Sequence, residues 1–330
     1  MPDNATLNQN VQVGIQSVLN TPVPATKRLL TLEVDLDVQT ETDTFFPNGS
    51  IFPSSAALNM EWTEGEISGI LTYTEVIYPL VALLGTVTPT AVGTAGKKWT
   101  FAPAANAVLN PTMLSLEKGS SVYGVRAPNA ILTGINFGWN RQDRIELGGS
   151  LMASAITPGF TMTTIATNAT VPTVRVMPPQ VSIYFSATYA GLPGTKLLRA
   201  FEASFSLDDL YAAVWPLNSA LTGHDGYVPT QPSSESTLLL MADAAGLAFL
   251  TQVRAGTIGY LRIEAVGPAL PAPDTGFNYT FTVDLAIQVS DVGAFEDSNG
   301  IYAIPFTFQP INDGTNPPIS IAVTNALATL

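Results

Sequence analysis

Few residues in this sequence can support catalysis. The chain has no cysteine and a single histidine, His224, so thiol chemistry is excluded and a Ser–His–Asp triad would depend on that histidine. His224 lies in TGHDG, whose glycines are typical of a turn, and we expect it in a solvated or contact-forming loop. The usual zinc sites need several His or Cys ligands, which one chain cannot supply here. The sequence therefore predicts no enzyme, no metal and no cofactor.

Carboxylates are the remaining candidates for chemistry. Two clusters have the residue types that bind a hard cation or form the acid pair of a glycoside hydrolase. They are Glu61, Glu64 and Glu66, and Asp291, Glu296 and Asp297. Neither cluster has the spacing of an EF-hand loop, and acidic turns between strands are the common explanation for such clusters.

A third acidic set has a regular spacing. Glu33, Asp35 and Asp37 alternate with apolar residues in LEVDLDV. A period of two places alternate side chains on opposite faces of a strand, so the three carboxylates are predicted to share one face. Two interpretations remain open, a solvated strand face and the wall of an acidic channel.

The segment that positions these carboxylates occurs twice in the chain. The two copies are KRLLTLEVDLDVQTETDTFFPNG at 27–49 and KLLRAFEASFSLDDLYAAVWPLN at 196–218. They match without a gap, and we call the offset from Lys27 to Lys196 the repeat spacing. In the second copy Glu202, Ser204 and Ser206 take the places of the three carboxylates. The repeat predicts two related β-units.

Shorter matches extend the repeat along each half. QVGIQ at 12–16 corresponds to QVSIY at 180–184, and MLSLE at 113–117 corresponds to YLRIE at 260–264. Each half also has one helical segment that ends at Gly-Thr, at 74–84 and at 243–255. Strand patterns dominate the rest. The sequence predicts a mainly β protein of two tandem β-sandwich or barrel-like domains, each with one α-helix.

The repeat also sets the predicted domain boundaries. The first domain is 1–155, with an N-terminal arm and an insertion at 87–111 that is expected to form a hairpin near 98–101. Residues 156–179 are the predicted linker. The second domain is 180–330, and its C-terminal tail is expected to add a strand at 319–323.

The composition restricts the partners of this chain. Apolar residues make up 46% and charged residues 12%, a low charge density that suits lasting contacts with other proteins. The net charge of −13 argues against binding to a nucleic-acid backbone, which needs clustered Lys and Arg. The start of the chain lacks a secretory pattern, and the apolar run at 76–84 is too short for a membrane helix. We expect a soluble, non-secreted protein with no membrane partner.

Taken together, these features resemble the tail tube (major tail) proteins of long-tailed, non-contractile bacteriophages. The resemblance rests on the N-terminal arm, the strand KRLLTLEVDLDV, the polar segment after FFPNG and the single helix of each half. It also rests on the closing strand pairs ILTGINFGWNRQDRIELGGSLMA and YTFTVDLAIQVS with GIYAIPFTFQP. Because the unit occurs twice, the chain is similar to the doubled variant, in which three chains make a pseudo-hexameric ring.

This resemblance implies a structural virion protein whose homotrimeric rings stack into a tube for DNA ejection. The implied partners are the chain itself, a tape-measure protein in the lumen, and tail terminator and tail-tip proteins. DNA would pass through without specific binding, and the tail would be assembled in the bacterial cytoplasm. The residues expected to face the lumen are Glu33, Asp35, Asp37, Glu202, Ser204 and Ser206. Those expected between rings are Asn48, Gly49, Ser50, His224, Asp225 and Tyr227, with the segments 48–55 and 218–236 and the N-terminal arm.

Two other functions fit the composition less closely. A β-sandwich module that binds carbohydrate or acts as an adhesin would need exposed aromatic rings on one sheet face. The four tryptophans are instead spread singly, at Trp62, Trp99, Trp139 and Trp215. A glycoside hydrolase would need a paired-carboxylate cleft, for which Glu61 or Glu66 would be the candidates.

Overall fold

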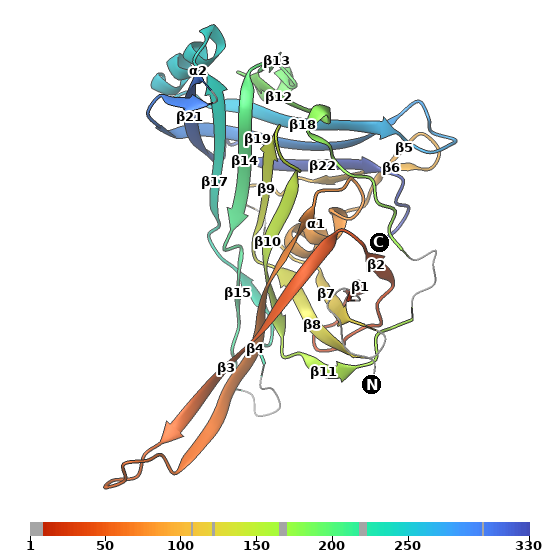
Figure 1. Cartoon of the computed structure of the whole chain (residues 1–330), viewed down its shortest axis with the longest axis vertical. Coiled ribbons are helices and arrows are strands. Elements are labelled where there is room, and N and C mark those ends of the chain that lie inside the picture. The colour runs from red at the N-terminus through yellow and green to blue at the C-terminus, as the bar shows by residue number, and fades with distance from the viewer. Residues whose placement is uncertain (1–8, 107, 121–122, 165–169, 218–222, 299) are drawn as a thin grey trace.

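The computed structural model confirms the predicted mainly β fold. It describes residues 9–106, 108–120, 123–164, 170–217, 223–298 and 300–330. Strands account for 54% of the chain and helices for 7%, and large antiparallel sheets dominate (Figure 1).

The elements of the first half follow one another in the order that the repeat predicts. They are β1 (Asn10–Gln16), β2 (Lys27–Leu29), β3 (Leu32–Phe45), β4 (Ser55–Ile70), α1 (Ile77–Leu84), β5 (Thr90–Val92), β6 (Gly96–Phe101), β7 (Met113–Gly119), β8 (Gly124–Leu132), β9 (Ile135–Asn140) and β10 (Glu146–Ser154). The predicted linker contains a further strand, β11 (Thr157–Phe160), which pairs with β8.

The second half repeats this order with a longer excursion. Its elements are β12 (Val181–Ser186), β13 (Thr195–Lys196), β14 (Ala200–Asp208), β15 (Tyr211–Ala213), β16 (Tyr227–Pro229), β17 (Ser233–Met241), α2 (Ala244–Arg254), β18 (Gly259–Ala269), β19 (Asn278–Val292), β20 (Glu296–Ser298), β21 (Ile301–Pro310) and β22 (Ile319–Asn325). The small pair β15–β16 stands apart from the main sheet.

The two halves have the same strand pairing. In the first half the pairs are β1–β2, β1–β7, β7–β8, β8–β10, β10–β4 and β4–β3. In the second they are β12–β13, β12–β18, β18–β19, β19–β21, β21–β17 and β17–β14. The chain therefore contains two copies of one β-unit.

Strand register agrees with the repeat spacing. Across β3, β4 and β10 one row of opposed residues is Asp35, Glu66 and Ser150. Across β14, β17 and β21 the corresponding row is Ser204, Thr237 and Thr307. Asp35 and Ser204 are separated by the repeat spacing, and the counterparts on the other strands are also opposed, so the sequence match and the hydrogen-bonded register coincide.

The shorter upstream matches are two residues out of register. Gln12 on β1 lies opposite Glu117 on β7, as the matches require. Gln180, however, precedes β12, and Glu264 on β18 lies opposite Ser182 instead. A slip of two residues keeps every side chain on its original face, so an alternating pattern cannot reveal it.

Helix α1 begins later than the sequence predicts, and this removes the difficulty of its proline. A start at residue 74, as predicted, would place Pro79 inside the helix. The observed start at Ile77 places Pro79 in the first turn, where the missing N–H costs no helical hydrogen bond. Seven of the eight α1 residues are buried, as expected for a helix that is apolar on all sides. In the second half Asp243 Oδ1 accepts a hydrogen bond from Gly246 N at 3.1 Å, which caps α2 as predicted.

The two halves share one core. Strand β9 of the first half pairs with β14 of the second, from Ile135 opposite Leu207 to Asn140 opposite Glu202. Beneath this junction the ring of Phe137 lies 6.3 Å from that of Phe205, and both side chains are at most 1% exposed. The predicted domains are thus joined by a continuous sheet rather than by the linker alone.

The insertion at 87–111 extends the sheet of the second half. Its hairpin β5–β6 is close to the predicted position, and β6 pairs with β22, the predicted C-terminal strand. The Asp274 carboxylate accepts hydrogen bonds from the backbone N–H groups of Thr94, Ala95 and Gly96, at 2.6–2.7 Å. These three donors hold the pKa of Asp274 below its usual value.

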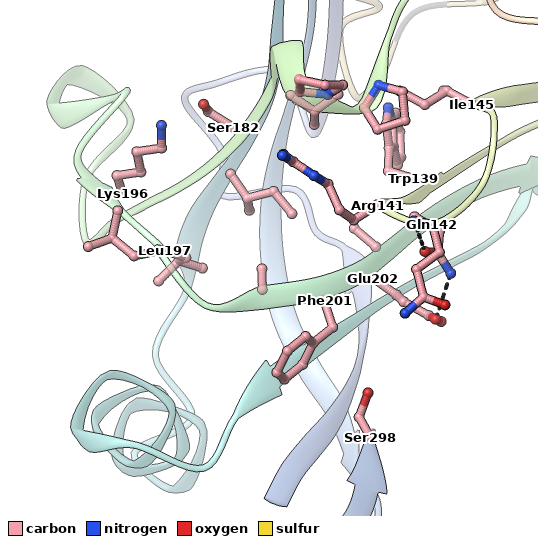
Figure 2. A pocket seen from close by; sticks show the side chains of 18 residues that line it. Trp139, Arg141, Gln142, Ile145, Ser182, Lys196, Leu197, Phe201, Glu202 and Ser298 are labelled. Atoms are coloured by element: carbon pink, nitrogen blue, oxygen red, sulfur yellow. Dashed lines mark hydrogen bonds between the residues drawn. The ribbon is translucent and has the colours of Figure 1, made fainter. Parts of the chain in front are cut away.

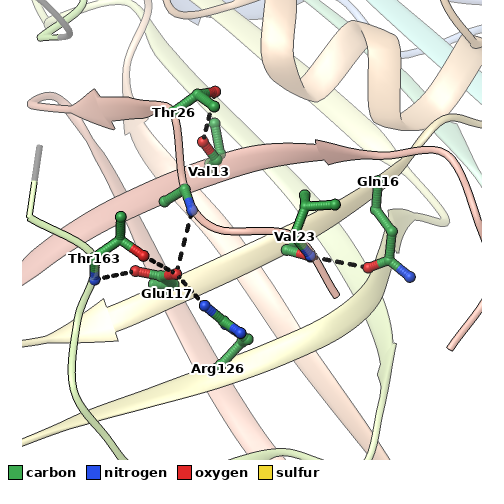
Figure 3. A network of polar contacts seen from close by, with 9 residues as sticks. Val13, Gln16, Val23, Thr26, Glu117, Arg126 and Thr163 are labelled. Carbon is green, nitrogen blue, oxygen red and sulfur yellow. Dashed lines mark hydrogen bonds and ion pairs between the residues drawn. The ribbon is translucent and has the colours of Figure 1, made fainter. Parts of the chain in front are cut away.

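A buried ionic network on β7 and β8 stabilises the first half. The carboxylate of Glu117 on β7 is fully buried and contacts Arg126 Nη2 on β8 at 2.9 Å (Figure 3). It also accepts hydrogen bonds from Ala25 N, Thr163 N and Thr163 Oγ1, at 3.3, 2.8 and 2.8 Å. One side chain therefore ties the β1–β2 connection and the segment after β11 to the sheet.

Replacing Glu117 by alanine is expected to reduce the free energy of unfolding by about 3 kcal/mol, because Arg126 and three donors lose a buried acceptor. Urea unfolding followed by circular dichroism measures the change. Glu146→Ala is the control, since the Glu146–Arg144 pair is more than half exposed and its loss should cost under about 1 kcal/mol. Equal losses in the two variants would contradict the assigned role of Glu117.

Candidate functional site, an acidic sheet face shared by both halves

Strands β3 and β4 present a row of carboxylates to solvent. Glu33, Asp35 and Asp37 are exposed, whereas the alternating Leu32 and Val34 are buried. This confirms the predicted one-face arrangement. Opposite these three residues on β4 lie Ser68, Glu66 and Glu64, all exposed. Because opposed residues of antiparallel strands share a face, β4 doubles the acidic row.

The junction β9–β14 carries this face into the second half. Glu202, Ser204 and Ser206 lie opposite Asn140, Gly138 and Asn136 of β9. From there the register continues through β10 and β4 to β3. One complete row runs through Ser206, Asn136, Gly148, Ser68 and Glu33. The structure thus brings all six residues predicted to face a lumen onto one face of one sheet, and the lumen itself stays a prediction.

The shared face is strongly acidic. By strand register its carboxylates include Glu33, Asp35, Asp37, Glu41, Glu64, Glu66, Glu146, Glu202, Asp208 and Glu235. Two cations contact them: Lys118 Nζ lies 3.0 Å from Asp35 Oδ1, and Arg144 Nε lies 2.5 Å from Glu146 Oε1. The hydrogen bond to Glu146 and its charge raise the pKa of Arg144. Carboxylates outnumber these cations, so the face repels polyanions.

Sequence reasoning missed several members of this face. Glu64 and Glu66 alternate in EWTEGEIS, which is the same period-two signal that identified β3. Glu146 and Glu235 are single acidic residues in their segments and give no such signal. Only the pairing of β10 and β17 with the rest of the sheet places them on this face.

The first predicted contact segment is the tip of a long hairpin. Strands β3 and β4 extend well beyond the body of the molecule (Figure 1). Asn48, Gly49 and Ser50 form the exposed turn, in which Gly49 has a φ of 81° and Ser50 N donates to Pro47 O at 3.0 Å. Their role between rings stays a prediction.

Apolar side chains flank this turn. We define the hairpin tip as Phe45, Phe46, Ile51 and Phe52, whose exposed fractions are 61, 55, 87 and 76%. Sequence reasoning treated the segment as polar and missed this group, although FFPNGSIF contains all four residues. Large apolar side chains gathered on an exposed surface are typical of interaction sites.

The prediction for the second contact segment is wrong for His224. This residue is 1% exposed and lies inside the chain, where its ring packs against Tyr227 at 4.7 Å and Trp215 at 5.9 Å. His224 Nε2 is 3.4 Å from Ser154 Oγ. It therefore cannot contact a second ring, because the excursion of the second half folds back onto the first half.

Of the two other predicted contact residues near His224, one is half-buried and one is exposed. Tyr227 is half-buried, and its hydroxyl donates a hydrogen bond to Asn129 O in the first half. Asp225 is exposed and stays a candidate for contacts between rings. Residues 218–222 of the predicted contact segment, and residues 1–8 of the N-terminal arm, lie outside the described residues.

Burial makes His224 a source of pH dependence. Burial lowers the pKa of His224 below its ordinary value of about 6.5. The unfolded chain then takes up a proton at higher pH than the folded chain. The contribution of neutral His224 to the free energy of unfolding is therefore fully present above about pH 6.5, and it is lost as the pH falls towards the lowered pKa. Because His224 is the only histidine, urea unfolding between pH 8 and about 5.5 should show this slope. His224→Phe should flatten it; an unchanged slope in that variant would exclude His224 as the cause.

A cleft of about 510 Å³ lies beside the junction of the halves (Figure 2). Its lining includes Arg141, Lys196 and Glu202, and Asn140 Nδ2 donates to Glu202 Oε1 at 2.7 Å. Its aromatic residues are Trp139, which is 4% exposed, and the half-buried Phe201. The cleft thus lacks the exposed aromatic rings that a glycan site needs.

The acidic clusters do not form a metal site. Among the described residues, no group of three or more His, Cys, Asp or Glu side chains is arranged to hold a metal ion. Glu61, Glu64 and Glu66 lie along β4, whereas Asp291 lies on β19 and Glu296 and Asp297 on β20.

Comparison with known proteins assigns no family. No protein-family model matches the chain, and no curated protein matches it. Of the described helices, none combines the length and hydropathy needed to cross a membrane.

Proposed function

We infer that this chain is a structural virion protein that self-assembles into stacked rings and forms the tail tube of a bacteriophage. The observation that carries the proposal is the acidic face, which runs without interruption across both repeated units through β9–β14. One side of this sheet packs against the core. In the proposed tube its polar side lines the channel. Three copies, each with two units, would make a pseudo-hexameric ring.

The charge of the shared face suits a conduit for DNA. Binding to a duplex depends on Lys and Arg side chains that neutralise phosphates and release counterions. A wall of carboxylates and hydroxyl groups offers phosphate no such partner. DNA would therefore slide past the face without being held, and the same lumen would hold a tape-measure protein during assembly.

The remaining partners follow from a tube with two ends. Tail terminator and tail-tip proteins would close the stacked rings, and assembly would take place in the cytoplasm of the host before the tail becomes part of the virion. The proposal requires no catalytic group and no cofactor.

The packing of the tryptophans favours this proposal over a carbohydrate-binding module, since even Trp215, which is 37% exposed, packs against another ring. Trp99 and Trp139 are 2 and 4% exposed. Trp62 and Trp215 are in contact, with ring centroids 5.5 Å apart and the planes at 70°, and Trp62 Nε1 donates to Glu64. Edge-to-face packing occupies these rings, so they do not form a flat sugar-binding row.

Sedimentation velocity of the purified chain, followed by negative-stain electron microscopy, tests the proposal. We expect a concentration-dependent shift from single chains to rings, and short tubes at high protein concentration. A preparation that stays monomeric at every concentration, salt and pH would overturn it.

A further inference from the structure

The β9–β14 junction shows how one unit pairs with the next within the chain. Strands β8 and β9 follow each other closely and together have two long edges. Along one of these edges β7 pairs with β8, as far as Leu114 opposite Ala130. The same edge then passes to β14, which pairs with β9 from Ile135 onward. Within the chain, the β-edge beyond β7 is thus filled by β14 of the second unit.

The second unit has the corresponding edge, on β19, but no described strand pairs with it beyond β18. Strand β18 pairs with β19 as far as Gly259 opposite Ile287. Ile287 is the counterpart of Ala130, because each of them is the last residue of its strand to pair along this edge. Strand β19 continues to Val292, and among the described residues no strand pairs with that edge beyond Ile287.

Matching bulges fix the correspondence of the two edges. In the first unit the N–H groups of Thr133 and Gly134 both donate to Ser150 O. In the second unit the ladder is irregular between Val289 and Asp291, opposite Thr307. The offset from Ser150 to Thr307 equals the offset from Ala130 to Ile287, so the ladders and the bulges give the same alignment of the two units.

The same offset identifies the residue that matches Ile135. Beyond the first bulge Ile135 lies level with Gly149. Its counterpart at this offset is Val292, which lies opposite Phe306 beyond the second bulge. Val292 therefore takes the place in the second unit that Ile135 takes at the internal junction.

The first unit has the complementary empty edge. Strand β14 is paired on both sides, with β17 and with β9. Strand β3, its counterpart at the repeat spacing, pairs with β4 alone among the described strands. Each chain therefore carries two unpaired edges that match the two partners of its own internal junction.

Exposed apolar residues mark both empty edges. At the internal junction Leu207 is 4% and Phe137 1% exposed. Val38, the counterpart of Leu207, is 44% exposed, and Phe295, just beyond the end of β19, is 52% exposed. The position that Leu207 fills at the buried junction is thus uncovered on β3, and an exposed aromatic ring lies next to the empty edge of β19.

We propose that the outer edge of β3 pairs antiparallel with the edge at the end of β19 in a second copy of this chain, with Val38 opposite Val292. The register follows from Ile135 opposite Leu207, transferred by the two offsets. The joint is head-to-tail, so each copy donates one edge and accepts one, and a closed ring leaves neither edge unpaired. This inference rests on the proposed function and specifies its partner and contact.

Disulfide trapping tests the register, because the chain has no cysteine of its own. Directly opposed residues of antiparallel strands have Cα atoms roughly 4.5–5.5 Å apart, within the range of a disulfide. The variant Val38→Cys with Val292→Cys should form covalent dimers and trimers on a non-reducing gel after mild oxidation. The two single variants, and Val38→Cys with Val266→Cys, are controls; Val266 is 40% exposed and lies on β18.

The outcomes separate this inference from the proposed function. Covalent oligomers formed by the Val38–Val292 pair, and not by the controls, would support the register. Rings seen by electron microscopy without this cross-link would overturn the register and leave tube assembly intact. If the protein forms no rings and no cross-link, both proposals fail. Circular dichroism of each variant verifies that it is folded.

Discussion

Replacing the four apolar residues of the hairpin tip by serine is expected to abolish the stacking of rings. Phe45, Phe46, Ile51 and Phe52 are exposed in the single chain, so their replacement leaves its core unchanged. Burial of each side chain against a neighbour would contribute about 1.5–3 kcal/mol, and their joint loss exceeds what a reversible ring contact can tolerate. Negative-stain images should show single rings in place of tubes.

A matched variant tests whether the position of these residues matters. Val108, Leu198 and Leu217 are comparably exposed, at 81, 82 and 110%, but lie outside the hairpin tip. Replacing these three by serine should leave tube formation intact. If this control loses tubes as completely as the hairpin-tip variant, a general loss of surface hydrophobicity explains the result and the hairpin has no special role.

Reversing the charge of the β3 row is expected to convert the tube wall into a DNA-binding surface. The variant carries Glu33→Lys, Asp35→Lys and Asp37→Lys, and each change adds two charges, so the formal charge rises from −13 to −7. Clustered lysines release counterions from DNA, and binding weakens with salt by a slope of about 0.9 per phosphate neutralised. Short duplex DNA should co-sediment with the variant at about 50 mM salt and be released near 200 mM, whereas the unaltered protein binds none.

The control for this variant has the same formal charge. Asp43→Lys, Asp225→Lys and Asp297→Lys place three lysines at exposed sites on three separate segments of the chain. We expect weaker DNA binding from this variant, because its cations do not lie together on one sheet face. Equal binding by the two variants would show that net charge alone decides the outcome.

Features that repeat or alternate are predictable from the sequence. The period of two in LEVDLDV places Glu33, Asp35 and Asp37 on one face, and the repeat spacing identifies β14 as the counterpart of β3. Both signals are local, so they survive without knowledge of the packing. The mainly β class and the position of α2 follow from the same kind of pattern.

Features that depend on distant partners are not predictable in this way. His224 has the sequence context of a turn, yet it is buried because Trp215, Tyr227 and Ser154 surround it. The insertion at 87–111 pairs with β22, the last strand of the second half. The pairing of β9 with β14, on which the shared acidic face depends, likewise leaves no mark in either segment alone.

A cryo-electron microscopy map of the assembled protein would show directly whether the acidic face lines the lumen of a ring. We expect a closed ring in which β3, β4, β10, β9 and β14 line the lumen, with Glu33, Asp35, Asp37 and Glu202 pointing into it. A ring whose acidic face lies on the outer surface, or is buried between copies, would show that this face does not line a DNA channel.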